Sequence, residues 1–346
     1  MKKATALYFL SQKSINFQEE SLPSLKKDQV LIQSKYSAIS AGSEMLIYQG
    51  LIPEDIAIDA NLPALGGRMK FPLKYGYSLV GNIIDIGRNI EKKMLGKWVF
   101  VFHPHQSQVV TDIGNVFPIP PKVSPEEALF FPNLETAVSL VMDARPIIGE
   151  KIVVFGQGVV GLLTTALLAR IPQIQLIAVD PINRRLKYSR RFGAEQVLNP
   201  QDNDFQKSIN KLLGLDSRSH SETAGADLIF ELSGNPAALN SALQLAGYHA
   251  RIVVGSWYGN KEESIDLGTR FHRNRLQILS SQVSTINPFL RGRWTKQRRF
   301  DMVWQILQEI KPSALISHRI PFTEAAAAYQ LIDQRPAEVL QVVLTY

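Results

Sequence analysis

The sequence predicts an α/β protein in which a β-rich domain is joined to a domain built on a doubly wound parallel sheet. Three observations predict this fold class. Residues 152–155 form an apolar run with the length and β-branched content of a strand buried on both faces. Strand–helix alternation continues after this run, whereas short strands separated by turns precede it. The 346 residues are also too many for one ordinary core.

The composition is that of a globular protein, with 45% hydrophobic and 20% charged residues. There is no cysteine, which excludes disulfides, thiol nucleophiles and thiolate metal sites. The apolar residues 4–10 lack a following small-residue cleavage site, so we interpret them as a first strand and not as a signal peptide. No run approaches about 18 uninterrupted apolar residues, so we expect a cytoplasmic protein without a membrane span.

The first half of the chain is predicted to be β-rich. Its strands are expected at residues 4–10, 29–37, 79–86, 98–102 and 108–111. The loop-like stretch 50–76 is long enough to be a substrate lid. A capping box with Ser124, Pro125 and Glu127 predicts the start of a helix.

The second half is predicted to alternate between strands and helices. Strands are expected at residues 152–155, 175–179, 196–198, 227–231, 251–254 and 276–280, and helices at 159–170, 184–191, 204–213 and 236–246. Helices at 301–309 and 324–333 and a strand at 339–345 return to the β-rich domain. We place the domains at residues 1–145, 146–285 and 286–346, the last being the return.

A glycine-rich turn joins the strand at 152–155 to its helix. Gly156, Gly158 and Gly161 fit G-x-G-x-x-G, in which the first glycine permits the turn, the second lets backbone approach a pyrophosphate and the third packs helix on strand. Gln157, Val159 and Val160 complete this candidate cofactor loop. The pyrophosphate is expected at the helix N-terminus, where free N–H groups favour an anion. A tight turn that binds no nucleotide is the alternative.

Asp180 ends the next strand, close to the spacing of about 20 residues at which an acid meets the adenosine ribose. A carboxylate there favours NAD because it repels a 2′-phosphate. Arg184 and Arg185 keep NADP open as the alternative cofactor, unless they only solvate the start of a helix.

The positive charge is concentrated between residues 269 and 300, a stretch without Asp or Glu. It contains Arg270, Arg273, Arg275, Arg291, Arg293, Lys296, Arg298 and Arg299. Such a cluster attracts an anionic substrate, an acidic membrane surface or nucleic acid. Nucleic acid ranks last, because aromatic–basic interleaving and low-complexity tails are missing, and we expect none as a partner.

Several stretches together resemble the medium-chain dehydrogenase/reductase superfamily over essentially the whole chain. They are residues 43–50, 75–81, the Gly156 loop, 233–236, 320–322 and 328–331. The resemblance implies a GroES-like catalytic domain, a Rossmann domain and a cleft between them where the nicotinamide meets the substrate. It also implies a homodimer that pairs through the strand near residues 276–280.

The chain departs from the zinc-dependent members of this superfamily. Their His-Glu pair after the glycine that matches Gly76 is Tyr77-Ser78 here, and their cysteine falls at Ser40 and Ala41. Only Glu135 matches the third ligand. We therefore expect no zinc, and the chain looks most like zinc-less relatives of the bacteriochlorophyllide a dehydrogenase type.

Without zinc, a side chain must polarise the carbonyl. Tyr77 stands where a ligand would project into the cleft, and its phenol can donate to a developing alkoxide; packing is the alternative. Ser43 matches the hydroxyl residue that relays a proton in the family, or it only forms a turn.

Two histidines, His103 and His105, follow a strand and face one side if the chain stays extended. Either suits a general base near neutral pH. With Glu135 they could instead hold a new metal, or simply pack. Glu135 lies in a predicted buried helix, where a catalytic role and a structural ion pair are both open.

Further contacts follow from position. Gly255 and Ser256 end a Rossmann strand beside the expected nicotinamide, and Ser233 lies on a stretch that resembles the superfamily, so we assign these three to the cofactor. Tyr48, Trp257, His272 and Arg273 are assigned to the substrate, the last two for binding a carboxylate or phosphate.

These observations predict a zinc-independent NAD(P)-linked oxidoreductase that interconverts a secondary alcohol and a ketone on a small anionic substrate. Reduction of an activated C=C bond, as in enoyl and quinone reductases, is the alternative chemistry. A dinucleotide-binding protein without catalysis is the alternative from another class.

Overall fold

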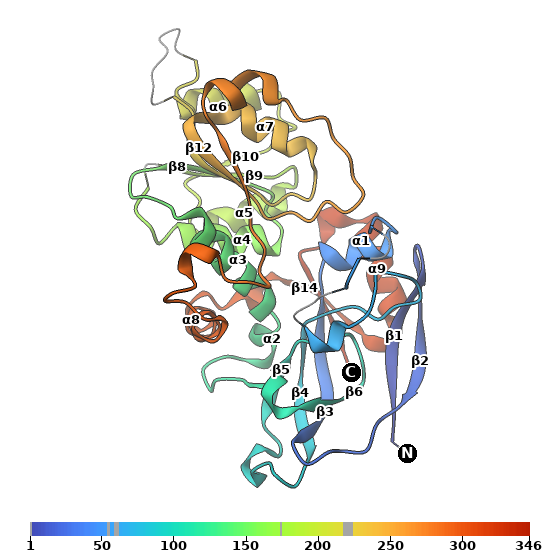
Figure 1. Ribbon diagram of the computed structural model, residues 1–346. Coiled ribbons are helices and arrows are strands. Elements are labelled where there is room, and N and C mark those ends of the chain that lie inside the picture. Colours follow the sequence, from blue (N-terminus) through green and yellow to red (C-terminus); the bar gives the residue numbers. More distant parts are fainter. Residues whose placement is uncertain (1, 54–55, 59–61, 174, 217–223) are drawn as a thin grey trace. The chain divides into compact units, whose positions relative to one another are not determined.

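The computed structural model describes residues 2–53, 56–58, 62–173, 175–216 and 224–346 (Figure 1). The chain divides into two compact units, one formed by Met1–Pro132 with Met302–Tyr346 and the other by Asn133–Asp301. Residues 54–55 and 59–61 of the predicted lid lie outside the described residues. Over the described residues, no helix is both long and apolar enough to cross a bilayer.

The second unit is built on a parallel sheet of six strands. Their order across the sheet is β10 (Gln196–Leu198), β9 (Gln175–Val179), β8 (Lys151–Phe155), β11 (Ala226–Glu231), β12 (Ala246–Val254) and β13 (Gln277–Ser280). Every neighbouring pair is parallel. This order reverses direction between β8 and β11, which makes their carboxyl ends the switch point where ligands bind in doubly wound sheets. The predicted α/β fold class is confirmed.

Both faces of β8 are covered, which explains its uninterrupted apolar run. Ile152 and Val154 pack in one cluster with residues of α3 (Phe131–Ala144) and α4 (Val159–Leu168). Val153 and Phe155 pack in another with α6 (Phe205–Leu213) and α7 (Ala237–Leu245). Figure 1 shows the sheet between its helices. Residue alternation along one strand therefore fixes two opposite helical layers.

The first unit contains two sheets. β1 (Lys3–Ser11) pairs antiparallel with β2 (Ser14–Ser21). The larger sheet runs β14 (Ile316–Pro321), β15 (Gln341–Thr345), β3 (Gln29–Ile39), β4 (Leu79–Ile86), β5 (Trp98–Val101) and β7 (Phe117–Pro118), and β6 (Gln108–Asp112) also pairs with β3. The pairing of β15 with β3 confirms that the last stretch returns to the β-rich unit.

Besides α3–α7, the described residues form the helices α1 (Ser43–Tyr48), α2 (Pro125–Ala128), α8 (Lys296–Ile310) and α9 (Ala325–Gln334). The capping box at the start of α2 is confirmed, because the side chains and backbone groups of Ser124 and Glu127 bond reciprocally. Helix α8 begins five residues before its predicted start at Asp301, since the basic residues that precede Asp301 include a buried Arg299. Helix α5 (Asn183–Arg191) lies between β9 and β10 in the chain.

The strands β2, β7 and β14 were not predicted from the sequence. β2 has the sequence SINFQEES and contains no fully buried residue, so its apolar pattern is weak. It forms because β1 supplies its backbone partners over nearly its whole length. Tertiary pairing thus decides these elements, and not their own periodicity.

Candidate active site

The glycine loop closes the switch point of the parallel sheet. Gly156 has a φ of +86°, and a Cβ at this position would lie 2.5 Å from backbone atoms of Leu232 and Ser233. A Cβ at position 161 would lie 1.9 Å from the carbonyl oxygen of Gly156, so the start of α4 touches the loop directly. At Gly158 no atom lies within 4 Å of such a Cβ. The loop is thus tight on its protein side and open at Gly158, as a pyrophosphate requires.

Helix α4 follows with Gly158 as its N-cap, and no side chain caps this end. The first N–H groups of an α-helix, here those of Val159 and Val160 among them, have no acceptor within the helix. Together with the helix dipole they form an anion-binding position. The loop between β8 and α4 is therefore a tight turn that leads into an uncapped helix N-terminus, and its role in cofactor binding stays a prediction.

Asp180 directly follows β9 and is 2% exposed. Its Oδ2 accepts a hydrogen bond of 2.7 Å from the N–H of Gln157, and its Oδ1 accepts one of 2.8 Å from the N–H of Ile182. Arg185 Nη1 lies 3.8 Å from Oδ2. The carboxylate thus joins the glycine loop to the start of α5, at the place where the ribose acid was predicted.

A second carboxylate, not found from the sequence, organises the end of β11. Glu231 is fully buried, and its Oε1 accepts a hydrogen bond of 2.9 Å from the N–H of Ser233. The hydroxyl of Tyr258 donates to Oε2 at 2.5 Å, and this contact together with desolvation raises the pKa of Tyr258. The Ser256 hydroxyl accepts from the N–H of Gly234 at 2.9 Å. These bonds hold the loops after β11 and β12 beside the glycine loop.

The loop after β12 holds two further predicted residues. A Cβ at Gly255 would lie 2.6 Å from side-chain atoms of Leu140 and Leu232, so only glycine fits without movement. Trp257 is 37% exposed and stands clear of the core.

In the β-rich unit, three hydroxyl groups form what we call the hydroxyl cluster: Ser40, Ser43 and Tyr77. The Tyr77 phenol donates to Ser40 Oγ at 2.8 Å and lies 3.0 Å from Ser43 Oγ. The two serine oxygens are 3.1 Å apart. All three residues are partly exposed, and Tyr77 packs against the core of the β-rich unit. The cluster brings together two of the predicted catalytic residues, Ser43 and Tyr77. Ser40 was singled out from the sequence only because it stands where the zinc-dependent members have a cysteine.

A fully buried glutamate–histidine pair lies directly behind the hydroxyl cluster. Glu44 Oε1 accepts from the N–H of Ser40 at 2.8 Å, and Glu44 Oε2 is 2.9 Å from His105 Nε2. Tyr329 also donates to Glu44 Oε2. His105 Nδ1 is 2.7 Å from Ser37 Oγ. Glu44 therefore accepts three hydrogen bonds and satisfies a buried carboxylate.

Glu44 was missed as a functional candidate, although its segment was noted. Its partners come from β3, the segment after β5 and α9, so no local pattern reveals them. A signal does exist at Gly76, whose φ is +125° and whose Cβ would lie 3.0 Å from His105 Nε2. The glycine before Tyr77 thus makes room for the imidazole of the buried pair.

The two histidines after β5 differ in their surroundings. Strand β5 ends at Val101, so both histidines lie in the segment between β5 and β6. His103 Nδ1 is 2.9 Å from the carbonyl oxygen of Pro104. Desolvation lowers the pKa of His103 to about 4, and the positive charge of Lys74 acts in the same direction. His103 is therefore neutral at physiological pH, in contrast with a base poised near neutrality.

Glu135 lies on α3 and forms a buried ion pair. Its Oε1 accepts from Arg299 Nη2 at 2.5 Å, and the same guanidinium donates to Ser139 Oγ at 2.6 Å and to the carbonyl oxygen of Val283 at 2.6 Å. The sequence left a catalytic role and a structural ion pair open for Glu135, and the contact with Arg299 is a structural ion pair.

Tyr48 packs in the core of the β-rich unit, 3% exposed, with its ring centroid 5.5 Å from that of Tyr329. His272 and Arg273 are exposed near the start of the basic stretch 269–300. Arg299 from the same stretch is buried, so the stretch does not form one continuous charged surface.

Comparison with known proteins agrees with this geometry. A family model described as zinc-binding dehydrogenase matches residues 159–299. D-Guloside 3-dehydrogenase from Escherichia coli K12 is 30% identical over 284 residues, which cover 80% of this chain and 78% of the relative. The chain belongs to the medium-chain dehydrogenase/reductase superfamily. It is an NAD(P)-dependent enzyme of that superfamily.

More distant members of the superfamily span the chain more fully. L-Threonine 3-dehydrogenase from Caldanaerobacter subterraneus subsp. tengcongensis is 22% identical, covering 91% of each chain. The structure of a protein described as short chain alcohol dehydrogenase (rspB) from E. coli CFT073, complexed with NADH, has a TM-score of 0.77 at 20% identity and covers 100% of both chains. These likenesses extend the shared fold over both units.

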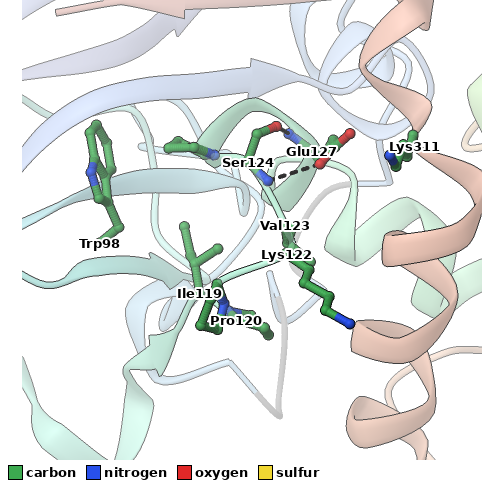
Figure 2. A pocket seen from close by; sticks show the side chains of 10 residues that line it. Trp98, Ile119, Pro120, Lys122, Val123, Ser124, Glu127 and Lys311 are labelled. Carbon is green, nitrogen blue, oxygen red and sulfur yellow. Dashed lines mark hydrogen bonds between the residues drawn. The ribbon is translucent and has the colours of Figure 1, made fainter.

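A separate cavity of about 490 Å³ lies elsewhere in the β-rich unit of this superfamily member (Figure 2). Trp98, Lys122 and Lys311 are among the residues that line it, and Figure 2 shows the bond between Ser124 and Glu127 at its wall. Its lining includes no residue of the hydroxyl cluster or the glycine loop, so it is distinct from both.

Proposed function

We propose that the chain is a cytoplasmic, zinc-independent, NAD(P)-linked oxidoreductase that interconverts a secondary alcohol and a ketone on a small anionic substrate. The observation that carries this proposal is the partly exposed hydroxyl cluster, where Tyr77 is held by Ser40 and Ser43. Relatives named as dehydrogenases of D-guloside and L-threonine support a reaction at an alcohol carbon.

In this proposal the Tyr77 phenol turns its single proton from Ser40 Oγ to the substrate and supplies the hydrogen bond that stabilises the developing alkoxide. A bound nicotinamide ring supplies or accepts the hydride. Desolvation raises the pKa of Tyr77, and Glu44 adds to this, while hydrogen bonds with Ser40 and Ser43 oppose it. The phenol therefore stays protonated at neutral pH and acts as a donor. Ser43, 3.0 Å away, exchanges a proton with it.

Glu44 and His105 support this cluster in the proposal without touching the substrate. Glu44 holds the main chain of Ser40, and His105 is fully buried against Glu44. His103 and Glu135 stay predicted catalytic residues. The low pKa of His103 makes it a hydrogen-bond acceptor at neutral pH, and Arg299 holds Glu135 in place.

For the cofactor, the chain's own residues fit a dinucleotide. The pyrophosphate would lie on the loop of Gly156, Gln157, Gly158, Val159, Val160 and Gly161. Asp180 would accept from the adenosine ribose, and Ser233, Gly255 and Ser256 would contact the nicotinamide end. We propose NAD over NADP, because the carboxylate of Asp180 would repel a 2′-phosphate. Arg185, whose Nη1 lies 3.8 Å from Asp180 Oδ2, keeps NADP as the alternative cofactor.

Zinc does not fit the residues that stand at the family's metal position. Ser78, where a glutamate ligand would be, donates to the carbonyl oxygen of Leu129 at 2.7 Å. His105 and Glu44 already satisfy each other. Among the residues that the structure describes, no three His, Cys, Asp or Glu side chains gather as a metal site. These contacts support a hydroxyl donor in place of the metal.

For the substrate, we propose contacts with Trp257, His272 and Arg273. Tyr48 was also assigned to the substrate from the sequence, but its burial in the core of the β-rich unit, 3% exposed, gives it a packing role. The exposure of His272 and Arg273 supports an anionic group on the substrate, because both can form charge-assisted hydrogen bonds. The homodimer through β13 stays a prediction. It is consistent with the position of β13 at the edge of its sheet.

The test is Tyr77→Phe, assayed with secondary alcohols, ketones and enones of either charge. We expect kcat for ketone reduction to fall about 100- to 1,000-fold, because one oxyanion donor is lost, with unchanged NADH affinity. Tyr36→Phe is the matched control and should keep its rate, because Tyr36 stacks on Trp98 and takes no part in the hydrogen bonds of the cluster.

Other results would redirect the proposal. An intact rate in Tyr77→Phe together with enone reduction would favour the C=C reductase. Dinucleotide binding without hydride transfer to any compound would indicate a catalytically silent protein. Stoichiometric zinc in the purified enzyme would contradict zinc independence.

A further inference from the structure

We propose that Gln157 is a positioning residue for the dinucleotide, and that its buried amide holds the glycine loop in a fixed position relative to helices α4 and α5. This inference rests on the cofactor site of the proposed function and is independent of the substrate. Gln157 occupies the first variable position of G-x-G-x-x-G, where the motif itself requires no particular side chain.

The side chain of Gln157 is 0% exposed and turns away from the open side of the loop. Its Nε2 donates to the carbonyl oxygen of Val154 at 3.2 Å. Its Oε1 accepts from Thr165 Oγ1 at 3.1 Å and from Ser189 Oγ at 2.9 Å. One amide therefore contacts β8, α4 and α5. A buried amide requires such partners, since leaving it unpaired is costly.

The backbone of the same residue reaches the ribose acid. The N–H of Gln157 donates to Asp180 Oδ2 at 2.7 Å. Its two neighbours are glycines, which give the loop little rigidity of their own. The side-chain bonds of Gln157 therefore fix the direction of the N–H, and with it the distance between the pyrophosphate position and the ribose acid.

The two hydroxyl groups that donate to Gln157 Oε1 differ in how specifically their removal would test this role. Ser189 Oγ also lies 3.0 Å from the carbonyl oxygen of Arg185, so its single proton has two acceptors. Among the residues that the structure describes, the Thr165 hydroxyl forms its hydrogen bond with Gln157 alone. Its neighbour Thr164 is also fully buried on α4 but donates to the carbonyl oxygen of Val160, within its own helix, at 2.8 Å. Thr165 and Thr164 form a matched pair.

The experiment compares Thr165→Val with Thr164→Val by calorimetric titration with NADH and NADPH and by thermal unfolding. Both changes remove one hydroxyl from adjacent buried positions of one helix. We expect Thr165→Val to raise the Kd for NADH about fivefold, equivalent to one neutral hydrogen bond. Thr164→Val should stay within about twofold of the unsubstituted enzyme.

Two further measurements separate positioning from general stability. The ratio of the Kd values for NADH and NADPH should not change in Thr165→Val, because the pyrophosphate is common to both cofactors. Gln157→Leu should weaken both by at least about tenfold, and the threonine pair keeps the test valid if this variant does not fold.

Equal Kd values for the two threonine variants, with both melting temperatures lowered, would overturn the inference and leave Gln157 a purely structural residue. Failure of the unsubstituted enzyme to bind either dinucleotide would overturn the proposed function as well. The two failures are therefore distinguishable.

Discussion

The glycine loop and the hydroxyl cluster are held in place by different kinds of interaction. The loop is fixed by close backbone packing at Gly156 and Gly161 and by the neutral amide of Gln157. The hydroxyl cluster is backed by Glu44 and His105, two fully buried ionisable groups. Steric fit thus supports the proposed cofactor position, and buried electrostatics support the proposed catalytic position.

The difference predicts different sensitivities. A closely packed backbone is destabilised when a substitution adds volume. A buried carboxylate network is destabilised when one member is removed, because its hydrogen-bond partners stay unpaired. Changes that alter charge should therefore affect the hydroxyl cluster, and changes that add volume should affect the glycine loop.

The largest effect is expected for Glu44→Ala. The change leaves Ser40 N–H, His105 Nε2 and the Tyr329 hydroxyl without their acceptor, so the free energy of unfolding should fall by about 3–5 kcal/mol. Urea-induced unfolding followed by circular dichroism measures this fall.

The control for Glu44 is Glu126→Ala, which removes an ion pair with Arg319 that is half exposed on the arginine side. Its loss should cost about 1 kcal/mol or less, because solvent screens exposed pairs. Equal costs for the two variants would contradict the view that buried charge holds the hydroxyl cluster.

A smaller effect is expected for Gly161→Ala. The added Cβ would lie 1.9 Å from the carbonyl oxygen of Gly156, so helix α4 has to move away from the loop. We expect a loss of about 2 kcal/mol in unfolding free energy, together with weaker NADH binding in a fluorescence titration. Gly114→Ala, where no atom lies within 4 Å of the new Cβ, should change neither. Unaltered NADH affinity in Gly161→Ala would show that this contact does not shape the cofactor loop.

The smallest effect is expected for His103→Asn, and it appears only as a dependence on pH. The pKa of His103 is lowered from 6.5 to about 4 by desolvation. Between these values the unfolded chain binds a proton that the folded protein does not, so stability falls as the pH falls from 6.5 towards 4.

Replacing His103 removes this contribution. From pH 7 to pH 5 the variant should lose about 2 kcal/mol less unfolding free energy than the unsubstituted protein, as measured by urea titrations at both values. The same loss in both proteins would mean that His103 is not desolvated, and that the pH sensitivity of the β-rich unit has another origin.

The sequence by itself determined the doubly wound sheet and the glycine loop, because these depend on contiguous residues. The apolar run 152–155, the glycine spacing and Asp180 all lie within one strand–helix–strand unit, and the structure forms each element there. The capping box at Ser124 and Glu127 was likewise local, and its hydrogen bonds span only three residues.

Only the tertiary structure decided the surroundings of the predicted catalytic residues. Glu44, His105 and Tyr329 lie far apart in the chain and meet in one buried network, while Arg299, apparently part of a charged surface stretch, is buried against Glu135. The physical reason is that a buried polar group must find partners wherever the fold brings them, and no spacing in the sequence encodes such distant pairings.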